Sequence, residues 1–219
     1  MSRALKNLLY EHVARVGKAL SSPKRLELLE LLAQGEKTVD VLAREASIGM
    51  KLASAHLRVL KESRLVESRR DGRFIAYALS GDDVAALWTT LHTVAAEHLV
   101  ELRIALESIV SGPERLTPET RLSLLDKAKR GSVLVLDVRP QAEYRAAHLP
   151  YARSIPLPEL KRRLTELPKS KEIVAYCRGP FCLMSGEAVE LLKKRGYRAR
   201  KISDGVAEWA AAGFAVEAS

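Results

Sequence analysis

The sequence has no long apolar run and very few cysteines, and these scarcities narrow the possible classes of protein. No stretch reaches the roughly 18 consecutive apolar residues that a membrane-spanning helix needs. The amino-terminal segment is amphipathic and lacks the continuous apolar core of a secretory signal. We therefore expect a cytoplasmic protein with no membrane partner. In that reducing compartment, a close pair of cysteines is more often reactive than structural.

The chain places its two cysteines within one short segment, Cys177 and Cys182. An apolar run at residues 173–176 predicts a buried strand before them, and residues 185–195 have the composition of a helix after them. Backbone N–H groups of such a loop and the positive charge of Arg178 favour an anion and lower the pKa of a thiol. The pattern predicts a reactive thiolate at Cys177, with Cys182 either a resolving thiol or a packing residue.

The length of 219 residues allows two domains of about 100 residues, each with its own core. Proline and glycine near residues 111–118 indicate a linker. We predict a first domain at residues 1–112, a linker at 113–118 and a second domain at 119–219. The predicted fold class is a mainly α winged helix-turn-helix domain followed by an α/β domain with a largely parallel sheet.

The formal net charge is +9, and the basic residues are unevenly distributed. Between Arg44 and Arg73 there are eight basic residues and four acidic ones, whereas residues 82–112 hold five acidic residues and one basic residue. The first domain therefore has one basic region, which is typical of a surface that meets nucleic acid.

Helical spacing of apolar residues predicts helices over residues 3–19, from Pro23 towards Gly35, over Val39–Glu45 and over residues 50–63. Two alternating runs joined at Asp71-Gly72 predict a hairpin, and a long helix is expected over residues 82–110. Two short helices with a tight break, followed by a hairpin, form a winged helix-turn-helix. The surplus apolar faces of the first and last helices predict a homodimer that would bind a pseudo-palindromic duplex operator.

The first half resembles the ArsR/SmtB winged-helix repressors over residues 3–110. The motifs that carry the resemblance are S-x-H-L-x-x-L-K, starting at Ser54, and L-V-x-x-R-x-x-G-R, starting at Leu65. The resemblance implies a dimeric repressor that leaves its operator when an inducer is sensed. The residues that we predict to contact DNA, on the recognition helix and the wing, are Met50, Lys51, Ser54, His56, Arg58, Arg69, Arg70 and Arg73.

Two metal-binding patterns of that family are incomplete in this chain. Residues 37–43 contain no cysteine pair, and His98-x-x-Glu101 is half of a zinc pattern whose partner residues are replaced by Ala85 and Leu87. We therefore predict no metal site and no cofactor, apart from a transient persulfide on Cys177.

In the second half, apolar runs at residues 133–138, 173–176 and 199–202 predict buried strands. They alternate with helices near residues 118–130, 141–147, 158–166 and 185–195. This alternation predicts an α/β domain whose functional residues lie at the carboxyl ends of its strands. The segment resembles a single rhodanese domain over residues 116–219. The positions that match are Asp137, Arg139, Glu143, His148, Pro150, Ala152, Ile155, Pro156, Cys177, Arg178, Gly179, Gly205, Trp209 and Gly213.

The rhodanese resemblance implies that Cys177 accepts sulfane sulfur from a donor such as thiosulfate or polysulfide. We expect Arg178, Gly179 and Phe181, together with Arg139 or Arg145, to stabilise the bound anion. Asp137, Arg139 and His148 are alternatively expected to stabilise the fold through capping and an internal ion pair. Phosphatases of this fold need an arginine six residues after the cysteine, and Leu183 at that position argues against phosphate-ester hydrolysis.

Three hypotheses of function follow. In the first, sulfur on Cys177 or a Cys177–Cys182 link changes the affinity of a repressor for DNA. In the second, the second domain is a thiosulfate sulfurtransferase that the first domain merely localises on DNA. A third, an arsenic-responsive repressor, has weaker support because two cysteines supply few soft ligands.

Overall fold

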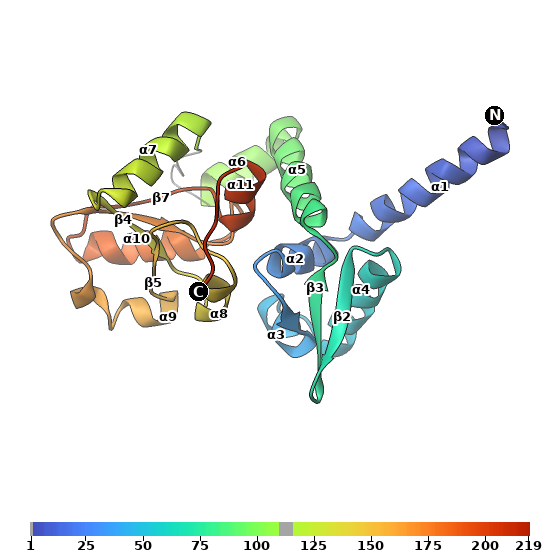
Figure 1. Cartoon of the computed structure of the whole chain (residues 1–219), viewed down its shortest axis with the longest axis horizontal. Coiled ribbons are helices and arrows are strands. Elements are labelled where there is room, and N and C mark those ends of the chain that lie inside the picture. The colour runs from blue at the N-terminus through green and yellow to red at the C-terminus, as the bar shows by residue number, and fades with distance from the viewer. Residues whose placement is uncertain (1, 110–115) are drawn as a thin grey trace. The chain divides into compact units, whose positions relative to one another are not determined.

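The computed structural model describes residues 2–109 and 116–219 (Figure 1). By its internal contacts the chain separates into two compact units, Met1–Trp88 and Thr89–Ser219. This division falls inside a helix, whereas the sequence predicted a linker at residues 113–118. Residues 110–115 of that linker lie outside the described residues, and the predicted domain boundaries stay predictions.

The first unit begins with the predicted helices. They are α1 (Arg3–Leu20), α2 (Pro23–Leu32), α3 (Val39–Glu45) and α4 (Met50–Glu62). Pro23 occupies the first turn of α2, where its missing N–H costs nothing because that N–H has no helical acceptor. Leucines from α2, α3 and α4, among them Leu28, Leu42 and Leu57, form one fully buried core. Helices α3 and α4 therefore pack as the predicted helix-turn-helix.

The wing is an antiparallel hairpin of β2 (Val66–Asp71) and β3 (Phe74–Leu79), with Asp71 opposite Phe74. Gly72 has a φ of 60°, a left-handed conformation that glycine adopts without strain, which fits the predicted turn. A short strand, β1 (Lys37–Thr38), pairs with β3 on its other side. No alternating pattern predicted β1, because two residues are too few to show one.

The predicted long helix over residues 82–110 is wrong in its continuity. The structure has α5 (Asp82–His98) and α6 (Val100–Ile109), separated at Leu99, and Val110 lies outside the described residues. Leu99 N still donates to Ala95 O at 2.8 Å, so the interruption is a local change of helical geometry. Neither proline nor glycine stands near Leu99, so the sequence carries no signal for this break.

The second unit contains a parallel sheet in the order β5-β4-β6-β7. Its strands are β5 (Arg153–Ser154), β4 (Val133–Asp137), β6 (Glu172–Tyr176) and β7 (Ala199–Lys201). The predicted parallel α/β architecture is confirmed. β5 was not predicted, since it is another two-residue strand without a period of its own.

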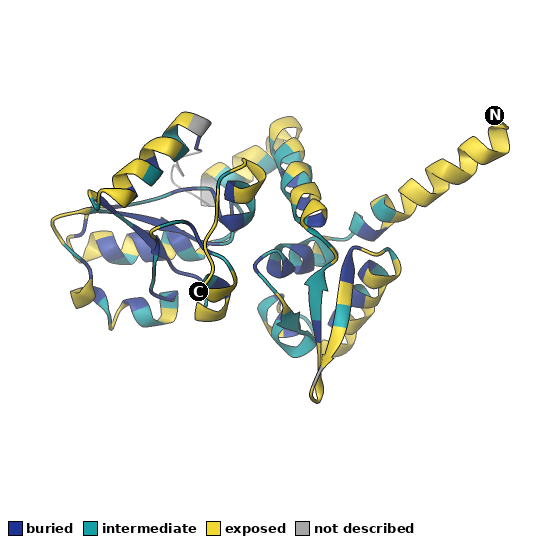
Figure 2. Cartoon of the chain, viewed as in Figure 1, coloured by how far each residue is buried: buried dark blue, intermediate teal, exposed yellow. Residues whose placement is uncertain are grey.

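Helices cover both faces of this sheet. One face packs on α9 (Leu157–Leu160), η1 (Leu164–Glu166) and α10 (Met184–Lys194), and the other packs on α7 (Pro118–Lys129) and α11 (Val206–Ala211). A further helix, α8 (Gln141–Ala146), follows β4. Figure 2 shows the strands dark blue between helices that are yellow on their outer sides. Alternate residues of the central strands thus pack into two cores, one on each face of the sheet, which leaves the ends of the strands as the place for functional residues. None of the described helices is long and apolar enough to cross a membrane.

Candidate functional site

The cysteine loop connects the end of β6 to the start of α10, at the carboxyl edge of the parallel sheet. Tyr176 ends β6, and Cys177 follows it directly. Gly179 has a φ of 141°, a conformation that a side chain would strain, and its carbonyl oxygen accepts from Cys182 N at 3.2 Å. The loop therefore turns tightly and brings the second cysteine back towards the first.

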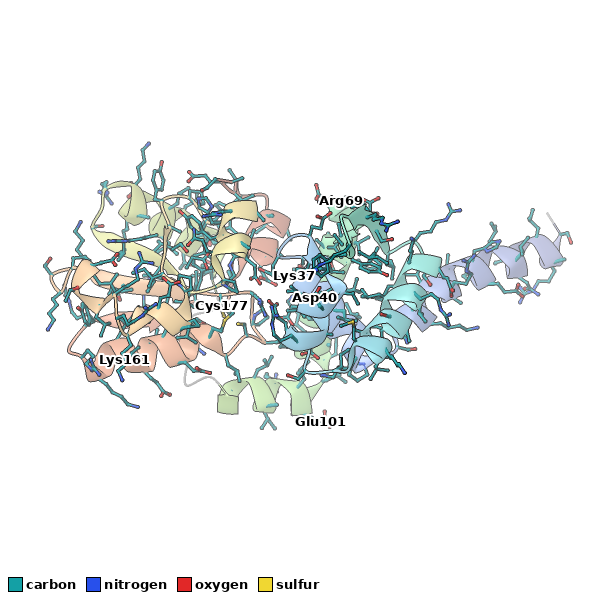
Figure 3. The ribbon with its side chains drawn as sticks, turned by 90° about the horizontal axis from the view of Figure 1, so that it is seen from below. Lys37, Asp40, Arg69, Glu101, Lys161 and Cys177 are labelled. Carbon is teal, nitrogen blue, oxygen red and sulfur yellow. The ribbon has the colours of Figure 1, made fainter. Side chains whose placement is uncertain are left out.

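Cys177 lies almost completely buried, with 2% of its surface exposed, and Cys182 is half-buried. Both carry free thiols. Cys177 Sγ lies 3.2 Å from the hydroxyl oxygen of Ser185 and 3.5 Å from the carbonyl oxygen of Cys182. Ser185 is in the first turn of α10, so the amino end of that helix faces the sulfur of Cys177. Figure 3 marks Cys177 in its domain.

The pKa values of the two thiols are shifted in opposite directions. Burial alone would raise the pKa of Cys177, but hydrogen bonds from the Cys182 thiol, the Ser185 hydroxyl and backbone N–H groups outweigh it and lower the pKa to about 7. The pKa of Cys182 is raised, first because its thiol donates to Cys177 and then because of burial. The pair therefore releases one proton near neutrality and retains the second. Such a pair contains a nucleophile and a protonated neighbour.

The backbone after β7 supports the loop from behind. A Cβ atom on Gly205 would lie 2.5 Å from the carbonyl carbon of Arg178 and 2.7 Å from the carbonyl oxygen of Cys177. Glu208 accepts a hydrogen bond from Gly205 N at 2.8 Å, and its carboxylate oxygens lie 3.0 Å from the position that a Cβ on Gly179 would occupy. Gly205, one of the positions that match the rhodanese pattern, is thus required because its backbone contacts the backbone of Cys177 and Arg178.

The arginines near the loop are held by carboxylates. Arg178 forms a forked ion pair with Glu143 of α8, with a shortest distance of 2.6 Å, and Arg139 forms one with Asp137, also at 2.6 Å. Asp137 and Arg139 are fully buried, and Tyr176 OH donates to Asp137 at 2.5 Å. The alternative role predicted for Asp137 and Arg139, an internal ion pair, matches these contacts. Anion binding by Arg178 and Arg139 stays a prediction.

The other residues predicted to bind the anion lie differently. Gly179 is buried within the turn, Phe181 is half-buried on the loop, and Arg145 is exposed on α8. Two residues that sequence reasoning missed are Ser185 and Glu208, because a lone serine in a helix and a lone glutamate among apolar residues have no distinguishing pattern. Their positions follow from the packing of α10 and α11 around the loop.

A histidine of α5 contacts the cysteine loop within the second unit. His92 is buried, its Nε2 lies 3.1 Å from Glu208 Oε1, and its ring meets Phe181 edge-on with centroids 5.6 Å apart. This contact could not be predicted from the sequence, since a lone histidine on a helix face belongs to no motif. It connects the helix that follows the wing to the loop that carries Cys177.

The predicted DNA-contacting residues lie on α4 and the wing of the first unit. On α4, Met50, Lys51, Ser54 and Arg58 are exposed, while His56 is half-buried. Leucines 57 and 60 point from the same helix into the core. The structure thus separates the predicted recognition surface from the packing surface of α4, as the sequence pattern indicated.

Three exposed arginines lie on the wing. Arg69 pairs with Glu36 in a forked ion pair, with Nε 2.8 Å from Oε2 (Figure 3 labels Arg69), Arg70 Nε donates to Gly72 O at 3.1 Å, and Arg73 stacks over the ring of Phe74. These contacts order the wing without burying its charges. Their role in DNA binding stays a prediction.

The two residues of the half zinc pattern, His98 and Glu101, lie in different helices. His98 ends α5 and Glu101 lies in α6, on opposite sides of the break at Leu99, and both are exposed. Within residues 2–109 and 116–219, no three histidine, cysteine or carboxylate side chains cluster as metal ligands would.

Comparison with known proteins agrees with both halves of the chain. The rhodanese-like domain family matches residues 120–212, and the family described as bacterial regulatory protein, arsR family, matches residues 22–68. HTH-type transcriptional regulator Rv0324 of Mycobacterium tuberculosis is 42% identical over 97% of this chain and 93% of its own length. The biofilm growth-associated repressor of Xylella fastidiosa is 40% identical over 37% of this chain and 72% of its own length.

A solved structure is similar to the first half. It is the homodimeric winged helix-turn-helix domain of Mb0332 from Mycobacterium bovis, 44% identical, with a TM-score of 0.43, covering 46% of this chain and 93% of that one.

Proposed function

Because the chain belongs to the arsR family of bacterial transcriptional regulators and carries a C-terminal rhodanese-like domain, we propose that it is a repressor controlled by sulfur on Cys177. The observation that carries this proposal is the Cys177–Cys182 pair. One thiol has its pKa lowered to about 7, and the other is kept protonated beside it. A pair that differs in this way supplies a nucleophile and a resolving thiol.

The first step is transfer of one sulfur atom to Cys177. Its thiolate attacks a terminal sulfur of an inorganic polysulfide, a new S–S bond forms, and the chain shortened by one sulfur leaves with its negative charges. No electron is gained or lost overall, because the oxidised sulfur is already in the donor. Ser185 and the backbone N–H groups that hold the thiolate would hold the persulfide in the same way.

The second step converts the persulfide to a disulfide. The Cys182 thiol passes its proton to the outer, anionic sulfur of the Cys177 persulfide, the Cys182 thiolate attacks the inner sulfur, the Cys177–Cys182 bond forms, and the outer sulfur leaves as hydrosulfide. The turn at Gly179 brings Cys182 back to Cys177, so this step needs no second protein molecule. The outcome is a switch in the loop that hydrosulfide or another thiol can reverse.

We propose that α5 carries the change towards the DNA-binding domain. Phe181 lies within the turn between the two cysteines and meets the ring of His92 on α5. A disulfide would move this turn, since the sulfur atoms must approach to a covalent distance. Helix α5 begins three residues after β3 of the wing ends, so a shift of α5 biases the element that precedes it.

The DNA partner is proposed to be a pseudo-palindromic duplex bound by a homodimer. Helix α1 exposes an apolar face, and apolar side chains of α5 and α6 are exposed as well. A two-fold dimer through these helices would present two α4 helices and two wings. A DNA partner is also the reason that we propose a cytoplasmic location. The exposed apolar side chains of α1 are Leu5, Leu8, Leu9, Tyr10 and Val13.

The test is binding of the full chain to DNA from its own upstream region, at one fixed salt concentration, with and without inorganic polysulfide. We expect polysulfide to release the wild type, and neither Cys177→Ser nor Cys182→Ser to be released. A His92→Ala variant should bind DNA normally and respond weakly. Equal binding of the wild type with and without polysulfide would reject the switch.

A second candidate function is a thiosulfate sulfurtransferase that the first domain localises on DNA. The match of residues 120–212 to the rhodanese-like family favours it. Thiosulfate-to-cyanide transfer that requires Cys177 and leaves DNA binding unchanged would support this reading. Transfer that survives Cys177→Ser would remove Cys177 as the nucleophile of either function.

A further inference from the structure

A lysine on the edge strand of the sheet shares the face on which Cys177 lies. Lys201 ends β7, which pairs in parallel with β6 so that Lys201 is opposite Ala175, and Ile202 N donates to Ala175 O at 3.2 Å. Side chains alternate along each strand, and residues in register share a face. Ala175, Cys177 and Ala199 all pack in the core under α10, so Lys201 points to that side of the sheet.

The amino group of Lys201 lies over the first turn of α10. A Cβ atom on Gly186 would stand 3.2 Å from Lys201 Nζ, so the absence of a side chain at Gly186 leaves room for the ammonium. Gly186 directly follows Ser185, whose hydroxyl oxygen is 3.2 Å from Cys177 Sγ. The half-buried lysine therefore stands beside the turn that holds the reactive sulfur.

The arginines of the loop region are already engaged with carboxylates. Arg178 is forked onto Glu143 and Arg139 onto Asp137. Burial lowers the pKa of Lys201, while the negative charge that Cys177, Cys182 and Glu190 carry when ionised opposes that shift. Glu190, on α10, also lies 3.9 Å from Lys194 at the exposed end of the helix.

We propose that Lys201 is the charge partner of the Cys177–Cys182 pair, a positioning residue that keeps one negative charge on the pair as thiolate and then as persulfide. The arrangement of β7, the open turn at Gly186 and the neighbouring Ser185 carries this assignment. A compact ammonium with three donors suits an anion that changes from one sulfur atom to two. The proposal depends on the proposed function only in taking Cys177 as the reactive thiol.

The experiment titrates Cys177 in the full chain by the ultraviolet absorbance of its thiolate, with Cys177→Ser as the blank. Lys201→Gln should raise the midpoint by up to about one pH unit, since a nearby positive charge favours the thiolate. Lys201→Arg should keep most of the wild-type midpoint. Persulfide formed by added polysulfide should also be shorter-lived in Lys201→Gln.

The matched control is Arg200→Gln. Arg200 precedes Lys201 on β7, points to the other face of the sheet and pairs with Glu172 at 3.2 Å. This variant loses the same formal charge from the same strand, and its midpoint should stay at the wild-type value. Equal midpoints in Lys201→Gln and wild type, or equal shifts in both glutamine variants, would overturn the proposal.

Two further variants test the inference should Lys201→Gln fold poorly. Glu190→Gln removes the carboxylate that competes for Lys201 and should lower the midpoint. Gly186→Ala would press on Lys201 Nζ and should raise the midpoint, although alanine favours the helix. Unchanged midpoints in both would reject Lys201 as the partner. Release from DNA by polysulfide is measured separately. If polysulfide fails to release the wild type while Lys201→Gln still raises the midpoint, the proposed switch is rejected and the role of Lys201 stands.

Discussion

The wing and the carboxyl edge of the parallel sheet both hold arginines in forked ion pairs, but the two pairs differ in exposure. Arg139 and Asp137 are fully buried side by side, whereas the side chains of Arg69 and Glu36 are 60% and 35% exposed. Breaking a buried ion pair leaves a charged group that neither a partner nor water stabilises. In an exposed pair, water or another ion readily replaces the lost partner. The buried pair therefore stabilises the fold, whereas the exposed Arg69–Glu36 pair would exchange its carboxylate for a phosphate if the wing contacts DNA as proposed.

The largest expected effect comes from breaking the buried pair. Arg139→Met should lower the free energy of unfolding of the second domain by about 3–5 kcal/mol, because Asp137 would keep a buried charge without its partner. Urea unfolding followed by circular dichroism measures it. The counterpart, Arg69→Ala on the wing, should cost less than about 1 kcal/mol and weaken DNA binding. Similar losses of stability in both variants would contradict the contrast.

A backbone contact of the loop gives the next largest effect. Gly205→Ala should lower the free energy of unfolding by about 1–3 kcal/mol, because its Cβ would overlap the backbone of Cys177 and Arg178. Sulfur loading of Cys177 should fall with it. The control is Gly17→Ala in α1, where no atom lies within 4 Å and the helix should gain about 0.5–1 kcal/mol. A tolerated alanine at 205 would show that the loop is not held from behind.

The cysteine pair predicts a dependence of stability on pH. The pKa of Cys177, about 7, lies below the ordinary cysteine value of 9.0, so its stabilisation is present above pH 9 and is lost as the pH falls through 7. The raised pKa of Cys182 works the other way, and reduces stability above pH 9. Stability relative to a Cys177→Ser, Cys182→Ser double variant should therefore rise from pH 7 to 9. A flat difference would show that Cys177 stays protonated.

The smallest effect belongs to the exposed arginines. Arg73→Gln should weaken binding to every duplex similarly and lower the slope of log affinity against log salt by about 1, since one phosphate contact is lost. Fluorescence anisotropy at several salt concentrations measures the slope. Arg145→Gln, an exposed arginine of α8 in the second unit, serves as the control and should leave the slope unchanged. Equal slopes for Arg73→Gln and wild type would remove this arginine from the interface.

Helices α1 to α4, the hairpin wing and the parallel sheet followed from the sequence because each depends on local periodicity or a turn signal. Leucine spacing, Ser22-Pro23 and Asp71-Gly72 act over a few residues, so the chain itself displays them. The two-residue strands β1 and β5 could not be predicted, because their partners in distant strands define them. The break at Leu99 was missed for a similar reason, since no breaking residue marks it.

The sequence by itself determined the two domain types, the position of the cysteine loop after a buried strand and the exposed face of α4, since these rest on motif and spacing. Tertiary structure alone decided which charged and polar side chains surround the cysteine loop. It paired Arg178 with Glu143 across 35 residues, placed Ser185 against the sulfur, and brought Lys201 from β7 to the first turn of α10. The physical reason is that burial and charge pairing depend on distances between segments, which the order of residues along the chain does not contain.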